Sequence, residues 1–245
     1  MNAIETKNLT KKYKDKTAVD SLNLTVGEGE LFSLLGVNGA GKTTTIRMLS
    51  CLSTPTSGEA YVNGKSCKDN KDEIKKIIGI SPQDTAVADN LTVRENLDFM
   101  ASVYYTDKAS IKEKVDNIIQ TFNLSEVENQ KAKTLSGGWK RKLSIAMALI
   151  SEPKVLFLDE PTLGLDVLAR RELWHTIEGL KGKMTIILTT HYMEEAEHLS
   201  DRIAIMISGK IRACGTVSDL EKLSGKKGLE EAFVAIAERG MSEDE

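Results

Sequence analysis

The chain of 245 residues is long enough to bury a substantial core without disulfides or metal ions. It carries 33 Lys and Arg against 36 Asp and Glu, a formal net charge of −3, which argues against bulk nucleic acid as the main partner because contacts to phosphates need a basic surface. No apolar run approaches the ~20 residues that cross a bilayer, the first residues lack the apolar stretch of a signal peptide, and three widely spaced cysteines fit a reduced compartment.

Short β-type runs alternate with helical patterns along most of the chain. The expected strands are at residues 22–26, 31–35, 59–62, 77–81, 155–158, 185–189, 203–207 and 210–213. The expected helices are at 43–52, 167–180 and beyond 215, and long helical segments with hardly any strand signal fill 92–150. Strand–helix alternation predicts an α/β fold with a parallel sheet. The helix-only middle predicts an inserted helical subdomain.

A glycine-rich segment separates the expected strand at 31–35 from the helix at 43–52. Residues 36–43 read Gly-Val-Asn-Gly-Ala-Gly-Lys-Thr and match the phosphate-loop pattern G-x-x-x-x-G-K-[ST]. Backbone N–H groups of such a loop point at a phosphate, and the following helix adds the positive end of its dipole. A glycine-rich turn that binds nothing is the alternative, but the position between strand and helix favours a nucleotide site. Its predicted residues are Gly36, Asn38, Gly39, Ala40, Gly41, Lys42, Thr43 and Thr44.

Two carboxylates, Asp159 and Glu160, follow the apolar run 155–158. Ligands of parallel sheets bind beyond the carboxyl ends of the strands, so this strand end can face the phosphate loop. Asp159 would then hold Mg²⁺ together with the Thr43 hydroxyl. Glu160 would orient and deprotonate the attacking water. Solvated carboxylates are common at strand ends, so the pair is informative only in combination with the phosphate loop.

Further short motifs, in the family's order, resemble the ATP-binding cassette (ABC) family over nearly the whole chain. The matches are Tyr13 (the aromatic residue that stacks on adenine), Gln83 (the Q-loop glutamine), Leu135-Ser136-Gly137-Gly138 (the signature), Gly164-Leu165-Asp166 (the D-loop) and His191 (the switch histidine). The N-terminus of the helix after Ser136 offers free N–H groups to an anionic phosphate. A tyrosine among lysines, taken alone, is usually a surface residue.

The resemblance implies a P-loop NTPase (RecA-like) fold: a parallel sheet core, an N-terminal antiparallel β subdomain and an inserted helical subdomain. It implies an ABC ATPase domain over residues 1–220, with the helical subdomain at about 88–150, and a C-terminal helical tail over 221–245. ATP and Mg²⁺ are the implied ligands, with Thr43, Gln83 and Asp159 at the metal. Glu160, His191 and Gln83 are the implied catalytic residues.

The signature departs from the family at its fifth residue. The usual continuation is Leu-Ser-Gly-Gly-Gln, and here Trp139 stands in place of the glutamine. Phosphate contacts through Ser136 and the glycine backbone survive this change, whereas transmission to a partner cassette is put in doubt. The basic run at 140–142 is expected either to form a solvated helix face or to attract phosphate.

One copy of each motif indicates one cassette per chain, so the resemblance implies a second cassette. This is either a second copy of the chain, as a homodimer in the assembled transporter, or a related second chain. Residues 36–45 and 170–174 resemble the ABC-2-type exporters of sodium, drugs and lipids. This similarity implies a separate multi-span membrane subunit and a cytoplasmic location on the inner face of the cell membrane. Residues 229–233 resemble the exporters' C-terminal helix, but an ordinary amphipathic helix that packs on its own domain fits them equally well.

The resulting hypothesis is an ATP-hydrolysing subunit of an ABC exporter that energises transport through its membrane subunit. The membrane subunit would contact residues 82–104, where Leu91, Val93, Leu97 and Phe99 form either a groove for the partner or the subdomain's own core. A soluble ABC ATPase acting on a non-membrane machine is the alternative, as is a nucleotide-dependent binding module. No nucleic-acid partner is expected. Asn70-Lys71-Asp72-Glu73 does not match the guanine-reading pattern N-K-x-D and lies at the wrong place in the chain, which disfavours a GTPase.

Overall fold

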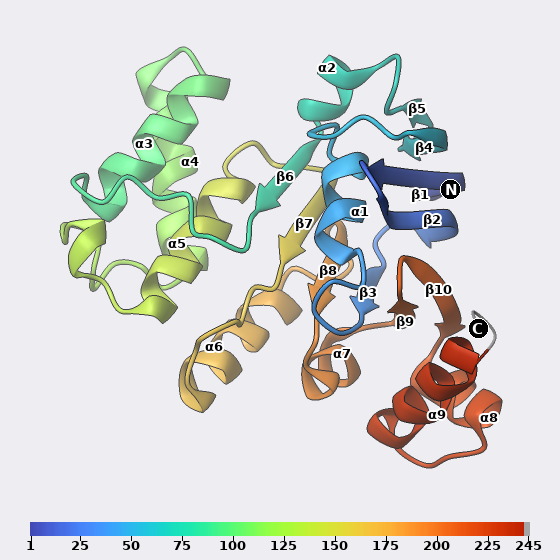
Figure 1. Ribbon diagram of the computed structural model, residues 1–245. Coiled ribbons are helices and arrows are strands. Elements are labelled where there is room, and N and C mark those ends of the chain that lie inside the picture. Colours follow the sequence, from blue (N-terminus) through green and yellow to red (C-terminus); the bar gives the residue numbers. More distant parts are fainter. Residues whose placement is uncertain (243–245) are drawn as a thin grey trace. The chain divides into compact units, whose positions relative to one another are not determined.

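The computed structural model describes residues 1–242, and the chain forms two compact units (Figure 1). The first unit comprises Met1–Lys75 and the chain from Lys181 onward. The second unit comprises Lys76–Leu180. Residues 243–245 of the predicted C-terminal tail (221–245) lie outside the described residues. The boundary between the predicted ATPase domain and this tail, at 220/221, stays a prediction.

An antiparallel sheet opens the first unit, in the order β2-β1-β4-β5. Its strands are β1 (Asn2–Tyr13), β2 (Lys16–Gly27), β4 (Ser57–Val62) and β5 (Lys65–Ser66). Buried apolar residues recur along β1 and β2 among exposed polar ones, which is typical of strands with one face in the core. This sheet confirms the antiparallel β subdomain that the family resemblance implies.

The second set of strands in this unit has the order β10-β9-β3-β8. The strands are β3 (Leu31–Leu35), β8 (Thr185–Thr190), β9 (Arg202–Ile207) and β10 (Lys210–Gly215). Every residue of β3 and β8 is buried, because β3 pairs in parallel with both β8 and β9 and parallel sheets are covered on both faces. Strand β10 runs antiparallel to β9, since Ser208 and Gly209 at φ 47° and 83° make a two-residue hairpin turn.

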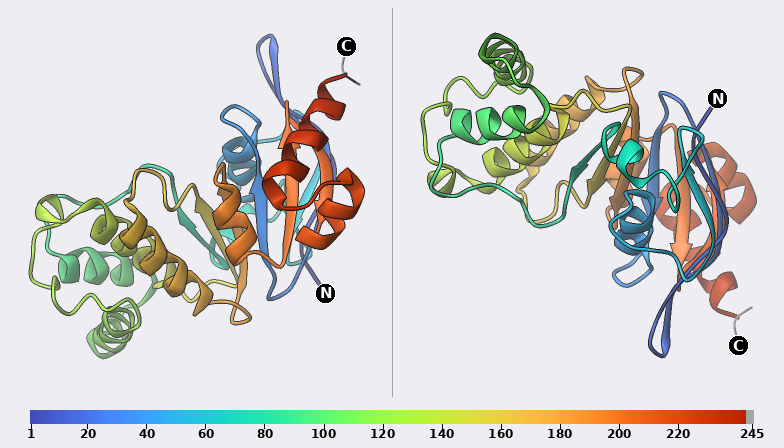
Figure 2. Two further views of the ribbon diagram at one scale, coloured as in Figure 1. Left: turned by 90° about the horizontal axis from the view of Figure 1, so that it is seen from below. Right: turned by 90° about the horizontal axis from the view of Figure 1, so that it is seen from above.

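The helices of the first unit are α1 (Lys42–Leu49), α2 (Lys71–Lys75), α7 (Met193–Leu199), α8 (Val217–Ser224) and α9 (Leu229–Ser242). Helix α9 inserts Leu229, Phe233 and Ile236 into a cluster that also contains Leu35 of β3 and Ile205 of β9. Figure 2 shows α9 beside the strands of this unit. The tail helix therefore packs on its own unit, as the second interpretation of residues 229–233 predicts.

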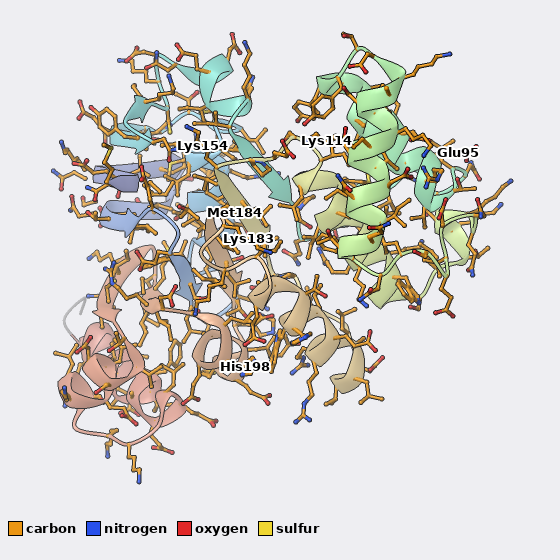
Figure 3. All side chains as sticks on the ribbon, turned by 180° about the vertical axis from the view of Figure 1, so that it is seen from behind. Glu95, Lys114, Lys154, Lys183, Met184 and His198 are labelled. Atoms are coloured by element: carbon orange, nitrogen blue, oxygen red, sulfur yellow. The ribbon has the colours of Figure 1, made fainter. Side chains whose placement is uncertain are left out.

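In the second unit, strands β6 (Ile78–Ser81) and β7 (Val155–Asp159) pair in parallel. The helices are α3 (Val93–Tyr104), α4 (Lys108–Thr121), the 3₁₀ turn η1 (Ala132–Thr134), α5 (Gly137–Leu149) and α6 (Val167–Glu178). Thr92 and Glu95 cap α3 reciprocally, and Lys114 of α4 forms an ion pair of 2.6 Å with Glu152. Figure 3 labels Glu95 on α3 and Lys114 on α4.

The α/β class and most expected elements are confirmed, and four elements were not anticipated. Strand β1 is rich in Lys, Thr and Asn, so it lacks an apolar run, and β5 has only two residues. Helices α2 and α7 are shorter than two turns, too short to give a helical periodicity in the sequence. The helix expected at 43–52 ends at Leu49, because Cys51 has the left-handed φ of 61°.

Candidate nucleotide-binding and catalytic site

The phosphate loop lies between β3 and α1, as predicted, and two of its glycines are required by space. A Cβ on Gly36 would lie 2.3 Å from the Met206 carbonyl oxygen. A Cβ on Gly41 would lie 2.4 Å from the Ala18 carbonyl oxygen, and Gly41 also has φ 105°. Any larger residue would displace the backbone of the loop. The loop is thus a tightly held cradle of main-chain groups at the start of a helix, which suits a phosphate.

Lys42 is the first residue of α1 and only 5% exposed. Its Nζ donates to the Gly36 carbonyl oxygen at 2.7 Å and to the Val37 carbonyl oxygen at 3.3 Å, so the ammonium lies within the loop. Asn38 and Gly39 form the exposed tip, Ala40 is buried, and Thr43 and Thr44 are half-buried in the first turn of α1. The arrangement places one positive charge among the loop's backbone groups.

His191 immediately follows β8, and this end of β8 adjoins the phosphate loop. Leu35 pairs with Thr190, and the Gly36 N–H donates to the Thr190 carbonyl oxygen at 3.2 Å. The His191 and Tyr192 rings lie with centroids 4.1 Å apart. The first unit therefore brings the phosphate loop and the His191 strand end together.

Tyr13 ends β1 and is 44% exposed. Lys11 Nζ lies 5.0 Å from the centroid of the Tyr13 ring. The Tyr13 ring is therefore exposed enough to stack on a base. Its role in adenine binding stays a prediction.

Asp159 and Glu160 lie in the second unit, at the end of the fully buried strand β7. They are 4% and 5% exposed, which rules out a solvated pair. Glu160 has φ 50°, in the left-handed region that a non-glycine residue seldom adopts. Ser81 at the end of β6 pairs with Leu158 near the end of β7. The Q-loop segment with the exposed Gln83 therefore leaves β6 at the end of the strand pair where Asp159 and Glu160 lie.

The signature and D-loop segments adjoin within the second unit. Ser136 caps α5, and its Oγ accepts a hydrogen bond from the Trp139 N–H at 3.4 Å. A Cβ on Gly138 would lie 3.2 Å from the Ala169 Cβ. Asp166 caps α6 by accepting from the Leu168 and Ala169 N–H groups at 2.9 and 3.0 Å. Of the four signature residues, Leu135 is buried, Ser136 and Gly137 are exposed, and Gly138 is half-buried.

The basic run 140–142 is neither a solvated face nor a free phosphate attractor. Lys140 pairs with Asp89 at 3.0 Å. Lys142 is 8% exposed, pairs with Glu172 at 3.0 Å and lies 4.7 Å from the centroid of the Trp139 ring. Arg141 is 5% exposed and binds backbone carbonyls of the Q-loop. Sequence reasoning missed these contacts, because a run of charges on a helix gives no signal of burial.

The expected partner-binding segment divides into core and surface. Val93 and Leu97 are fully buried, so they belong to the subdomain's own core. Phe99, by contrast, is 61% exposed, and Val103 and Tyr104 on the same helix are 64% and 43% exposed. Leu91 is half-buried. The C-terminal half of α3 thus presents an apolar surface that the sequence alone did not separate from the core.

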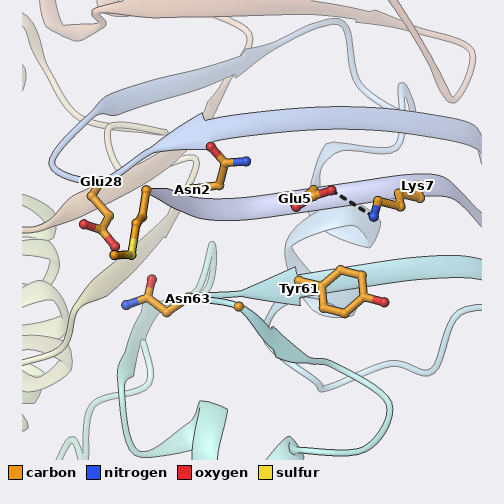
Figure 4. Close-up of a pocket in the computed structure, with 8 residues that line it drawn as sticks. Asn2, Glu5, Lys7, Glu28, Tyr61 and Asn63 are labelled. Carbon is orange, nitrogen blue, oxygen red and sulfur yellow. Dashed lines mark ion pairs between the residues drawn. The ribbon is translucent and has the colours of Figure 1, made fainter.

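A separate pocket of about 520 Å³ lies on the antiparallel sheet of the first unit (Figure 4). Its lining includes Asn2, Glu28, Tyr61 and an ion pair of 3.1 Å between Glu5 and Lys7. None of the predicted site residues lines it. It does not belong to the predicted nucleotide site.

Comparisons with known proteins decide the family. A family model described as ABC transporter matches residues 19–163, more than half of the chain. This chain belongs to the ABC transporter family. It is 44% identical over 226 residues to the human phospholipid-transporting ATPase ABCA3, a match that covers 91% of this chain and 13% of that protein. It is 40% identical over 239 residues to the probable multidrug ABC transporter ATP-binding protein YbhF of Escherichia coli (strain K12). That match covers 95% of this chain and 41% of YbhF.

A solved ABC cassette has the same fold. The dimeric structure of a post-hydrolysis state of the ATP-binding cassette MJ0796, bound to ADP and Pi, matches with a TM-score of 0.79 and 26% identity, over 87% of this chain and 98% of that one. The predicted family, the P-loop NTPase fold and the assignment as an ATP-binding ATPase cassette of transporter type are confirmed. The chain spans less than half the length of the two curated relatives. Within residues 1–242, every helix is too short or too polar to span a bilayer.

Proposed function

We propose that this chain is the ATP-binding and hydrolysing subunit of an ABC exporter and that it energises transport through a separate membrane subunit. One observation carries the proposal: the Lys42 ammonium is buried inside its loop, and that loop has space only for glycine at positions 36 and 41. Such a loop binds the phosphates of ATP through its N–H groups, and Lys42 turns from its carbonyl partners to the outer phosphates.

The residues present fit a magnesium ion. Thr43, Gln83 and Asp159 supply hydroxyl, amide and carboxylate oxygens, which are the ligands that Mg²⁺ prefers, and phosphates and waters complete its coordination. When bound, Mg²⁺ neutralises charge that develops on the phosphates during transfer. Thr43, Gln83 and Asp159 are the proposed ligands.

Glu160 is the proposed general base. Its carboxylate accepts the proton of the attacking water, and the rigid end of β7 holds it in place. His191 contacts the γ-phosphate and stabilises its charge. The N–H groups of the signature turn at Ser136, Gly137 and Gly138 bind the γ-phosphate of ATP held by a second cassette, with Asp166 at the junction. We propose that the second cassette is a copy of this chain, because the proposed site needs a signature segment from a second cassette.

The exposed apolar surface of α3, formed by Phe99, Val103 and Tyr104, is the proposed contact for a cytoplasmic helix of the membrane subunit. This contact would hold the cassette on the inner face of the cell membrane. YbhF is named as a probable multidrug transporter protein and ABCA3 as a phospholipid-transporting ATPase, which supports an export role.

Two measurements test the proposal. The full chain with MgATP should release phosphate at steady state, and omission of Mg²⁺ should abolish release.

The chain expressed in its own cells should sediment with the membrane fraction, and Phe99→Asp should move it to the supernatant without changing ATP binding. Phosphate release with no membrane association would support the soluble ATPase alternative. ATP binding without phosphate release would support a nucleotide-dependent binding module.

A further inference from the structure

Arg141 on α5 is a buried cation that the proposed chemistry does not use. Only 5% of it is exposed. Its Nη1 donates to the Pro82 carbonyl oxygen at 2.7 Å, and its Nη2 donates to the Gln83 carbonyl oxygen at 2.6 Å. Two short charge-assisted hydrogen bonds from one planar group therefore fix the two successive peptide groups on either side of the Gln83 Cα atom.

Other residues along α5 hold the strand that leads to Gln83. Ser144, one turn after Arg141, places its Oγ 2.9 Å from the Ser81 Oγ, and both are buried. One turn further, the Ala148 carbonyl oxygen would lie 2.3 Å from a Cβ on Gly79. Helix α5 thus contacts β6 and the start of the Q-loop in succession, and Arg141 makes the contact nearest to Gln83.

The two neighbouring cations have different partners. Lys140 pairs with Asp89, and Lys142 pairs with Glu172. Arg141 is the residue of the basic run 140–142 that hydrogen-bonds the Q-loop backbone, and a guanidinium can donate to both carbonyls at once in a fixed plane.

We infer that Arg141 is the positioning residue for Gln83. The inference rests on the proposed role of Gln83 at Mg²⁺. Arg141 lies in the second turn of the helix that begins at the signature residue Gly137, so the signature turn and the Q-loop backbone are held by one rigid element. A movement of α5 during cassette pairing therefore carries the Gln83 backbone with it, and the Gln83 side chain reaches the metal only from the position that Arg141 sets.

The test compares Arg141→Met, Arg141→Lys and the matched control Lys140→Met in the full chain, each measured for kcat, for KM with ATP and for the Mg²⁺ concentration at half-maximal rate. Arg141→Met should lower kcat about tenfold, the equivalent of one charge-assisted hydrogen bond, and raise the half-maximal Mg²⁺ concentration several-fold. The KM for ATP should change little, because the phosphate loop is untouched. Arg141→Lys should fall between wild type and Arg141→Met, and Lys140→Met should resemble wild type.

A double-mutant cycle with Gln83→Ala separates positioning from general destabilisation. If Arg141 acts through Gln83, Arg141→Met should slow the Gln83→Ala variant no further. Full multiplication of the two effects, or an unchanged Mg²⁺ requirement in Arg141→Met, would overturn the inference and leave the role of Gln83 intact. A Gln83→Ala variant with normal kcat and Mg²⁺ requirement would overturn the proposed role of Gln83 itself. If Arg141→Met does not fold, Arg141→Lys carries the same cycle.

Discussion

Lys42 is an ammonium group with little access to water, and such a group needs polar partners in the protein. Its partners include two carbonyl oxygens of its own loop, those of Gly36 and Val37. Carbonyls carry partial charge only, so a phosphate oxygen with full negative charge is a stronger acceptor for the same Nζ. The loop is therefore prepared to exchange its internal hydrogen bonds for contacts to ATP.

Replacing Lys42 by alanine should weaken ATP binding at least about tenfold, the value of one hydrogen bond to a charged group, and should remove measurable turnover. Titration of the folded variant with a fluorescent ATP analogue gives the affinity, and phosphate release gives the rate. Near-normal turnover in a variant with a wild-type circular dichroism spectrum would remove the phosphate-loop assignment.

Trp139 is the residue at which this chain departs from the family signature, and its ring contacts Lys142. The change to glutamine removes a cation–π contact worth about 0.5–1 kcal/mol at a partly exposed site. The Ser136 cap accepts from the backbone N–H of residue 139, so it does not depend on that side chain.

We therefore expect Trp139→Gln to lower the urea midpoint slightly and to leave turnover equal or higher, because a polar side chain at this turn aids cassette pairing. Urea unfolding and phosphate release on the same preparation check both parts. A loss of turnover beyond tenfold at unchanged stability would show that the tryptophan itself is needed.

At the scale of elements, predictability follows burial and length. The fully buried strands β3, β7 and β8 appear as short apolar runs, so the sequence places them within a residue or two. Strand β1 could not be found in this way, because its apolar residues are few and alternate irregularly with lysines and threonines. Pairing register depends on neighbours that lie far away in the sequence, which no local pattern encodes.

Helix α6 supplies a prediction at this scale. Asp166, the predicted D-loop residue, caps its first turn, so Asp166→Ala should cost about 1 kcal/mol of unfolding free energy. Asp166→Asn keeps the accepting oxygen and should unfold like wild type. Urea denaturation of the three proteins checks the order. Equal midpoints for Ala and Asn would show that the cap contributes nothing, and lost turnover in a stable Asp166→Asn would assign a catalytic need to the charge.

At the scale of the whole molecule, the motifs predicted the family and the fold correctly, and the comparisons confirm both. The prediction was possible because each motif is a short local pattern that can be read directly from the sequence. The roles of Tyr13, Gln83, Glu160 and His191 stay predictions, since they depend on ATP and on a second cassette. Arg141 could not be predicted at all, because its partners are main-chain carbonyls and leave no mark in the sequence.

The central claim is that this cassette hydrolyses ATP with Glu160 as the general base, and Glu160→Gln tests it most directly. Glutamine keeps the size of the side chain but cannot accept a proton from water. Lys42, Thr43 and Asp159 are unchanged, so ATP binding should persist. The measurement is the steady-state rate of phosphate release by Glu160→Gln relative to wild type at saturating MgATP. The account predicts a fall of roughly 10²–10⁴-fold. A rate within a few-fold of wild type would contradict it, because another group would then supply the base.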